Sequence, residues 1–269
     1  MRIIGVDFTS RPGKSKPIAC ACCELRARSL HLSALTTVND FVAFETLLDS
    51  PGPWLMAVDA PLSLPREFVR AMRWGERWQD YVARATHMER SEFRDCVQRF
   101  KQHRPSGQKD LKRLIDQRAG AVSPLNVTRP PVGLMFYELT KRLLPRPISV
   151  IPVRTKSQHT RSVLEAYPAL VARQWLGREA YKDGRAEQLR PRRKLRAQLL
   201  HTMMSPAAAK YYGLEISIEE KFIAAMITDT QGDLLDAMLC AIQGAWAWQH
   251  LSGAFPRVCE GWIADPSMV

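Results

Sequence analysis

Five acidic residues stand at the ends of predicted secondary-structure elements, and this pattern constrains the fold most strongly. They are Asp7, Asp59, Glu165, Asp233 and Asp236. The first three each close a short apolar run typical of a buried strand, and the last two open a long helical pattern. A carboxylate at the end of a buried strand is unfavourable unless a cation meets it. We therefore expect these acids to meet in space around a shared site.

The first and fourth predicted strands would place Asp7 beside Asp59, because these strands are often neighbours in a mixed sheet. Two such carboxylates without a cation would repel each other, and the pKa of one would rise. Each could instead end its strand in a turn by hydrogen bonding its own backbone. Converging carboxylates are the usual oxygen ligands of Mg²⁺ or Mn²⁺, and a site of this kind is suited to phosphodiester chemistry.

The last two acids open the strongest predicted helix, over residues 230–251. Thr230 to Asp233 has the spacing of a helix-capping box, with aspartate in place of the usual Glu or Gln, so Asp233 has an ordinary structural explanation. Asp236 lies beyond the first turn, on a stripe of small residues that would pack close to a sheet. The i, i+3 spacing puts both acids on one face, so we expect Asp236 to face inward. Glu165 could simply be a first-turn acid favoured by the dipole of the next helix.

The chain carries a strong positive charge. Its 269 residues include 39 Lys and Arg against 27 Asp and Glu, a net charge of +12. This excess suggests a polyanionic partner such as nucleic acid, although an arginine-rich composition would also give a solvated basic surface. The length suits one large α/β domain with a sizeable core, and we interpret residues 1–269 as a single domain of unknown oligomeric state.

Neither a membrane span nor a secretion signal is evident. No apolar run approaches the roughly 18 residues that a spanning helix requires, and Met1 leads directly into the first strand rather than into a signal peptide. The six cysteines are spaced neither as metal ligands nor as a disulfide framework. Small buried thiols in a reducing compartment explain them better. We therefore expect a cytoplasmic protein without membrane contact.

The order of predicted elements favours an α/β fold with a long helical insertion. The first three strands form a β-meander, and the fourth is apolar until its last residue, as expected for a strand buried on both faces. Residues 66–146 are helical, basic and aromatic, and we interpret them as an insertion on the sheet. Further helices are predicted at 167–176 and 189–203. Strands are predicted at 2–8, 17–26, 29–35, 54–59, 148–153, 161–165 and 258–264.

Two segments have the composition of polyanion-binding surfaces. The densest basic run lies between residues 182 and 196, where it could track phosphates or form a solvated helix face. Trp74, Trp78 and Tyr81 recur at near-helical spacing among arginines of the insertion. They could stack on unpaired bases, but packing against the sheet is the commoner role of such a stripe. We therefore expect the aromatic stripe to belong to the core.

In their order along the chain, these motifs resemble the ribonuclease H-like superfamily. That pattern has an acid closing the first strand, a second closing a later central strand, and Asp-x-x-Asp-Ala opening a C-terminal helix. The ending at 232–237 is similar to that of RuvC-type resolvases. The closer resemblance is to the domain of unknown function 429 (DUF429) family, described as predicted nucleases of RNase H fold. It is carried by residues 5–7, 58–62, 165–168, 181–182, 233–241 and 260–263.

The resemblance implies a mixed five-stranded sheet flanked by helices, with the helical insertion placed after the fourth strand. It implies a nuclease that acts on DNA or RNA without a protein nucleophile. The absence of a Gly-x-Ser-x-Gly motif from the sequence agrees with this. Lys182 and Arg193 fall in the family-like stretch after the third acid, so they are the expected substrate-binding residues.

The resemblance also implies a two-metal-ion mechanism with Mg²⁺ or Mn²⁺. In such a site Asp7 bridges two ions roughly 3.5–4 Å apart. Asp59 and Asp236 each complete the shell of one ion, and Glu165 or Asp233 supplies the fourth acid. The expected catalytic residues are Asp7, Asp59, Glu165 and Asp236, and the expected metal ligands are Asp7, Asp59, Asp233 and Asp236.

Two other functions stay open. An actin-like, ATP-dependent small-molecule kinase shares this sheet topology, and residues 7–10 faintly resemble the first phosphate loop of those enzymes. Such kinases need a second glycine-rich loop, and the 14 glycines of this chain are not clustered. A non-catalytic nucleic-acid-binding protein with a decayed site is the third hypothesis, against which the complete set of acids counts.

Overall fold

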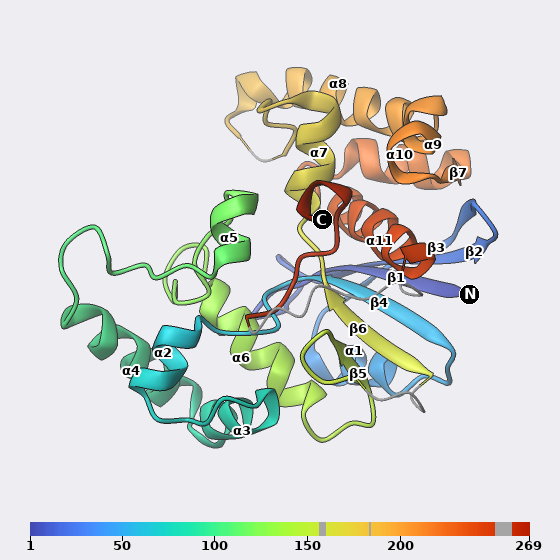
Figure 1. Ribbon diagram of the computed structural model, residues 1–269. Coiled ribbons are helices and arrows are strands. Elements are labelled where there is room, and N and C mark those ends of the chain that lie inside the picture. The colour runs from blue at the N-terminus through green and yellow to red at the C-terminus, as the bar shows by residue number, and fades with distance from the viewer. Residues whose placement is uncertain (156–159, 183, 251–259) are drawn as a thin grey trace.

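The computed structural model describes residues 1–155, 160–182, 184–250 and 260–269, and shows an α/β fold built on one mixed sheet (Figure 1). Within these residues the sheet has seven strands. They are β1 (Arg2–Asp7), β2 (Ile18–Arg26), β3 (Ser29–Val38), β4 (Trp54–Asp59), β5 (Ser149–Ile151), β6 (Arg161–Glu165) and β7 (Glu215–Ser217).

The strands are arranged in the order β5-β6-β4-β1-β2-β3-β7. The predicted meander is present, since β1, β2 and β3 are antiparallel neighbours. β4 pairs in parallel with β1, as expected, and β6 and β5 extend this parallel half. The mixed α/β character is confirmed, but the predicted count of five strands is wrong. The edge strand β5 lies within the strand predicted at 148–153, whereas β7 was not expected, because its three residues carry almost no period-2 signal.

One face of the sheet is covered by the C-terminal helices, which lie above it in Figure 1. Ile3 of β1 and Leu55 of β4 belong to the core on this side, in accord with the alternation of side chains along a strand. The helices that contribute to this core are α5 (Leu114–Ala119), α7 (Pro168–Leu176), α8 (Ala186–Met203), α9 (Pro206–Tyr212), α10 (Glu220–Thr228) and α11 (Asp233–His250).

The opposite face packs against α1 and most of the helices between β4 and β5. Ile4 and Val6 of β1 point into this second core, where Trp74, Trp78 and Tyr81 are also buried. The prediction that the aromatic stripe packs in the core is therefore confirmed. The helices on this side are α1 (Phe41–Leu48), α2 (Arg66–Ala71), α3 (Trp78–His87), α4 (Arg90–Gln102) and α6 (Val132–Leu143).

Helices α2 to α6 occupy the range predicted for the insertion, between β4 and β5. The chain ends in a short 3₁₀ turn, η1 (Pro266–Met268). The first residues of the predicted last strand lie outside the described part of the chain. Of its remaining residues, Ile263 forms an isolated parallel bridge with Glu165. Among the described residues, no helix has both the length and the apolar character needed to span a bilayer.

The close packing of α11 on β1 depends on glycine. A Cβ atom on Gly5 would lie 1.9 Å from the carbonyl oxygen of Ala237 and 2.3 Å from the backbone nitrogen of Ala241. The strand and the helix therefore touch backbone to backbone, with no side chain between them. One turn further along, a Cβ atom on Gly244 would lie 3.0 and 3.1 Å from side-chain atoms of Ala57 and Ile3, a tight but less severe contact. This approach holds the start of α11 directly over the ends of β1 and β4.

Candidate metal centre

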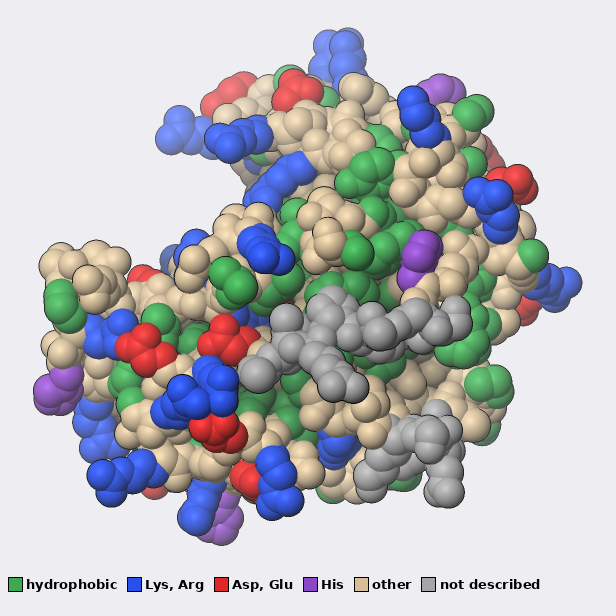
Figure 2. Space-filling view, in the orientation of Figure 1, with side chains coloured by type: hydrophobic (Ala, Val, Ile, Leu, Met, Phe, Trp, Pro, Cys, Tyr) green, Lys and Arg blue, Asp and Glu red, His purple; other side chains and the backbone are tan. Residues whose placement is uncertain are grey.

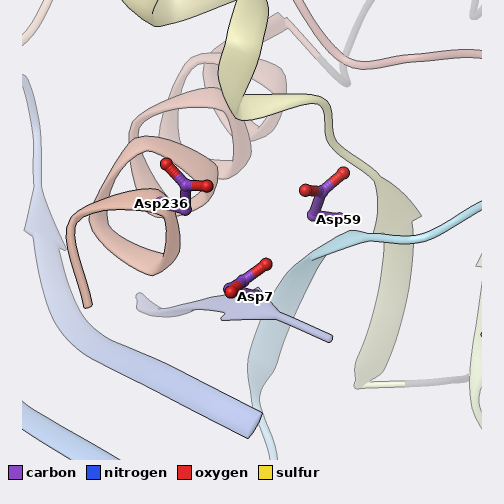
Figure 3. A group of neighbouring side chains, drawn as sticks. All are labelled: Asp7, Asp59 and Asp236. Carbon is purple, nitrogen blue, oxygen red and sulfur yellow. The ribbon is translucent and has the colours of Figure 1, made fainter. Parts of the chain in front are cut away.

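Three carboxylates from distant parts of the chain meet at one end of the sheet. Asp7 ends β1, Asp59 ends β4, and the two residues are direct partners in the parallel register. Asp236 comes from the first turns of α11, which packs on the same two strands. Each residue offers one carboxylate oxygen, and these atoms all lie within 4.8 Å of one another. Figure 3 shows the three side chains around a shared space between β1, β4 and α11.

The protein compensates two of these acids, Asp7 and Asp59, poorly. Burial raises the pKa of Asp7 well above its usual value, and the carboxylates of Asp236 and Asp59 raise it further. Burial, followed by the charge of Asp236, raises the pKa of Asp59 to about 7. Asp59 accepts no hydrogen bond from any residue that the structure describes. Among the described residues, this carboxylate therefore has neither a donor nor a direct cationic partner.

Asp236 is fully buried, and two side chains hold it in place. Burial raises its pKa, against the opposing charge of Lys182. Lys182 Nζ donates to one carboxylate oxygen, and the Tyr181 hydroxyl donates to the other. Arg192 and Arg196 of α8 donate to the backbone carbonyls of Lys182 and Tyr181, at 2.6 and 2.7 Å. The basic helix α8 therefore fixes the segment that supplies these two donors.

Asp233 lies beside the cluster but is not one of the three converging acids. Lys16 Nζ, from the loop after β1, lies 2.5 Å from Asp233 Oδ1 and 3.8 Å from Asp7 Oδ2. The capping role suggested for Asp233 belongs instead to Asp229, which accepts from the backbone N–H of Leu234 at 2.9 Å. Asp233 is thus left to pair with Lys16, which also lies near Asp7 of the cluster.

Glu165 does not join the cluster, although the sequence places it among the candidate catalytic acids. It pairs in register with Val58 rather than with Asp59, so the alternation of the strand turns it to the opposite face. There Arg113 binds both of its oxygens, at 2.5 and 2.8 Å, and also pairs with Asp116 at 2.6 Å. The backbone N–H of Leu62 donates to Glu165 as well. Its carboxylate is therefore already satisfied.

The two predicted substrate-binding residues lie in different surface depressions. Lys182 lines a cleft of about 660 Å³ beside the acids. Arg193 is exposed on α8 and lines a separate depression of about 340 Å³ with Leu189 and Ile227. Only Lys182 is thus placed next to the candidate centre.

The cleft lies between the end of α5, the helix α7 and the segment that follows it. Figure 2 shows the surface hollowed between the regions of α5 and α8, with Lys and Arg side chains on both sides. One acid of the cluster reaches the cleft, together with aromatic and cationic groups. The lining includes Asp59, Tyr167, Arg173, Arg178, Tyr181 and Lys182. A ligand in this cleft would meet positive charge on its way to the acids.

A comparison with known protein families identifies the chain. A family model described as a protein of unknown function (DUF429) matches residues 5–259. The chain belongs to the DUF429 family. No curated protein and no solved structure matches it. The chemistry of this DUF429 protein must therefore be argued from its own residues.

The donor set of the DUF429 protein fits a hard divalent cation. Carboxylate oxygens are the preferred ligands of Mg²⁺ and Mn²⁺, and three of them lie within 4.8 Å of one another. Asp59 has no competing donor among the described residues, so it is free to bind an ion. Burial is the main cause of the raised pKa of Asp7 and Asp59, and positive charge between the acids would remove the repulsion that raises it further.

Sequence reasoning missed three residues that shape this centre. Lys16 pairs with Asp233 and approaches Asp7, but nothing in its loop distinguishes it from Lys14. Tyr181 lies in a segment that carries the family resemblance, but the sequence alone indicated no role for it. Arg113 lies in a basic segment, 52 residues from Glu165 in the sequence. Only the folded chain shows that Arg113, among the many arginines of this protein, is the one that is buried against Glu165.

Proposed function

We propose that this DUF429 protein is a divalent-cation-dependent nuclease that hydrolyses phosphodiester bonds in DNA or RNA. The observation that carries the proposal is the buried cluster of Asp7, Asp59 and Asp236, whose oxygens converge without enough protein cations to neutralise them. The cluster borders a cleft that is lined by lysine and arginine. A site with acids at its base and cations on its walls suits a phosphate-bearing substrate that arrives with metal ions.

Mg²⁺ or Mn²⁺ ions bound here would supply the Lewis acidity that activates water and stabilises the leaving oxygen. We propose two ions, with Asp7, Asp59 and Asp236 as ligands. Asp233 is the better fourth acid, because both oxygens of Glu165 are bound by Arg113. In this arrangement Glu165 supports the loop after β4 through its contact with a backbone N–H, rather than touching an ion.

The protein's own cations have a second role in this proposal. Lys182 and Lys16 neutralise part of the acidic charge when no ion is bound. With Asp236 held by a metal ion, the Lys182 ammonium would be available to bind a substrate phosphate in the cleft that it lines. The net charge of +12 favours the approach of a polyanion, so cleavage should weaken as salt concentration rises.

The test is a cleavage assay with single- and double-stranded DNA and RNA in Mg²⁺, Mn²⁺ or EDTA. We expect metal-dependent cleavage that Asp7→Asn abolishes. The variant should keep the circular dichroism spectrum of the wild type and a cooperative melting transition. Asp95→Asn, which removes an exposed acid on α4, is the matched control and should keep full activity. Full activity of Asp7→Asn would reject the role given to the cluster.

The same assay separates the competing functions. Turnover of ATP without strand cleavage would support a small-molecule kinase. Salt-sensitive binding of nucleic acid without any turnover would support a non-catalytic binding protein. No cleavage and no binding under any of these conditions would reject nucleic acid as the substrate.

A further inference from the structure

The cleft beside the metal centre presents one tyrosine ring that the centre itself does not use. Tyr181 is committed to Asp236 through its hydroxyl, whereas Tyr167 is half-buried and lines the cleft. The buried side chain of Gln243 accepts from the backbone N–H of Tyr167 at 2.9 Å and donates to its carbonyl at 3.2 Å. A fully buried amide therefore fixes the backbone from which the Tyr167 ring projects.

Two arginines line the same cleft as this ring. Arg173 lies over Tyr167, with its guanidinium carbon 5.4 Å from the ring centre, and donates to the tyrosine hydroxyl at 3.3 Å. Its other terminal nitrogen donates to the carbonyl of Ala119 at 2.7 Å, which anchors the side chain. Arg178 lies exposed in the lining of the cleft and forms no ion pair with any described residue. An aromatic face with adjacent cations has the chemistry of a nucleotide site.

The depth of the acids limits which nucleic acids can reach them. Asp236 is fully buried and Asp7 nearly so, and Asp59 is the acid that lines the cleft. A cleft of about 660 Å³ has the size that holds one small ligand, in the range of about 300–1,000 Å³. So recessed a site favours a strand that can unstack over a base-paired duplex. An unpaired nucleotide can enter, as bases do in enzymes that act on unstacked nucleotides.

We propose that this cleft binds an unpaired nucleotide of a single-stranded nucleic acid, with its base stacked on Tyr167 and its phosphate held by Arg178. The proposal rests on the proposed nuclease function for its orientation toward the acids. Arg173 lies over the ring and keeps it in place. The DUF429 protein is then a nuclease for single strands, and a duplex is cut only where its strands separate.

A binding experiment tests the site without requiring turnover. A short fluorescein-labelled thymidine homopolymer is titrated with the Asp7→Asn protein in EDTA, and fluorescence anisotropy gives the Kd. Adding Tyr167→Ala should weaken binding by about fivefold to a hundredfold, the usual range for loss of one base–aromatic stack. Adding Tyr167→Phe keeps the ring and should leave the Kd within about twofold of the parent. Equal affinity of the alanine and parent proteins would overturn the proposal.

The cation and strand requirements are tested with matched controls. Arg178→Gln should weaken binding of the homopolymer, whereas Arg26→Gln should not. Arg26 is an exposed arginine at the end of β2 that lies away from Asp7. In Mn²⁺ the wild-type protein should cut a single strand at least about tenfold faster than the same sequence in a duplex, since one base pair must open first. Equal cleavage of both forms would overturn this inference and leave the nuclease function standing. Absence of all cleavage, with Tyr167-dependent binding intact, would reject the nuclease function alone.

Discussion

Two groups of buried acids lie on neighbouring strands of this protein, and they are treated in opposite ways. At the end of β6, Glu165 is bound by Arg113, which also pairs with Asp116, and each of these side chains is almost fully buried. At the end of β4, Asp59 faces two further aspartates and has no donor among the described residues. The first group is complete within the protein, whereas the carboxylates of the second repel one another. Buried carboxylates alone therefore do not mark a metal site, and the decisive observation is whether the chain supplies their partners.

The largest effect is expected from breaking the complete group. Arg113→Met leaves Glu165 and Asp116 buried without a cation, and removal of one partner of a buried pair usually lowers the free energy of unfolding by about 3–5 kcal/mol. Urea denaturation measures this change. The control is Arg26→Met, which breaks the exposed pair with Glu24 and should change stability by no more than about 0.5 kcal/mol. Equal midpoints for both variants would show that the buried network contributes little.

The incomplete group should respond instead to metal. Mn²⁺ at about one hundred times its Kd should raise the free energy of unfolding by about 2.7 kcal/mol, because the ion binds only the folded state. Asp59→Asn removes a ligand and should lose more than half of this gain. The measurement is the melting temperature with and without Mn²⁺. A gain that is the same in both proteins would place the ion elsewhere.

A third difference concerns pH in the absence of metal. Burial and the charge of Asp236 raise the pKa of Asp59 from 3.8 to about 7, so the folded state binds more protons than the unfolded state between these values. The resulting stability is fully present below about pH 4 and is lost as the pH rises to about 7. In EDTA, the melting temperature of the wild type relative to that of Asp59→Asn should fall by a few degrees over this range. A constant difference would contradict the raised pKa.

The smallest effect sharpens the contrast between the two groups. Glu165→Gln should lower the stability of the metal-free protein, because Arg113 loses a charged partner, but it should leave the gain from Mn²⁺ within about 0.5 kcal/mol of the wild type. Each melting temperature is compared with the metal-free value of the same variant. If Glu165→Gln loses the gain as Asp59→Asn does, Glu165 is a metal ligand.

The predicted part of the fold follows from local patterns. Apolar runs ending in acid identify β1 and β4, and their parallel pairing brings Asp7 beside Asp59 as expected. The stripe of small residues on the last long helix predicts its close approach to the sheet, which Gly5 makes possible. These features depend on neighbours in sequence or on periodic spacing, so one sequence is enough to find them.

The remaining part depends on choices among chemically similar residues. Glu165 ends a strand as Asp59 does, and only the register against Val58 shows that it faces the other way. Arg113 and Lys16 each lie among other basic residues, and only the folded chain shows that they pair with Glu165 and Asp233. The short strand β7 pairs with β3 far earlier in the chain. Such long-range pairings leave no mark on the local pattern of the sequence.

The contact at Gly5 has a consequence for how the acids keep their spacing. Since β1 and α11 touch through main-chain atoms, the gap between Asp7 and Asp236 is set by the path of the chain and hardly at all by rotamer choice. A methyl group at Gly5 would push β1 and α11 apart. It would increase the spacing between Asp7 and Asp236 without altering either residue. Substitutions on the surface helices would leave this spacing unchanged, whereas the smallest possible substitution at Gly5 would change it.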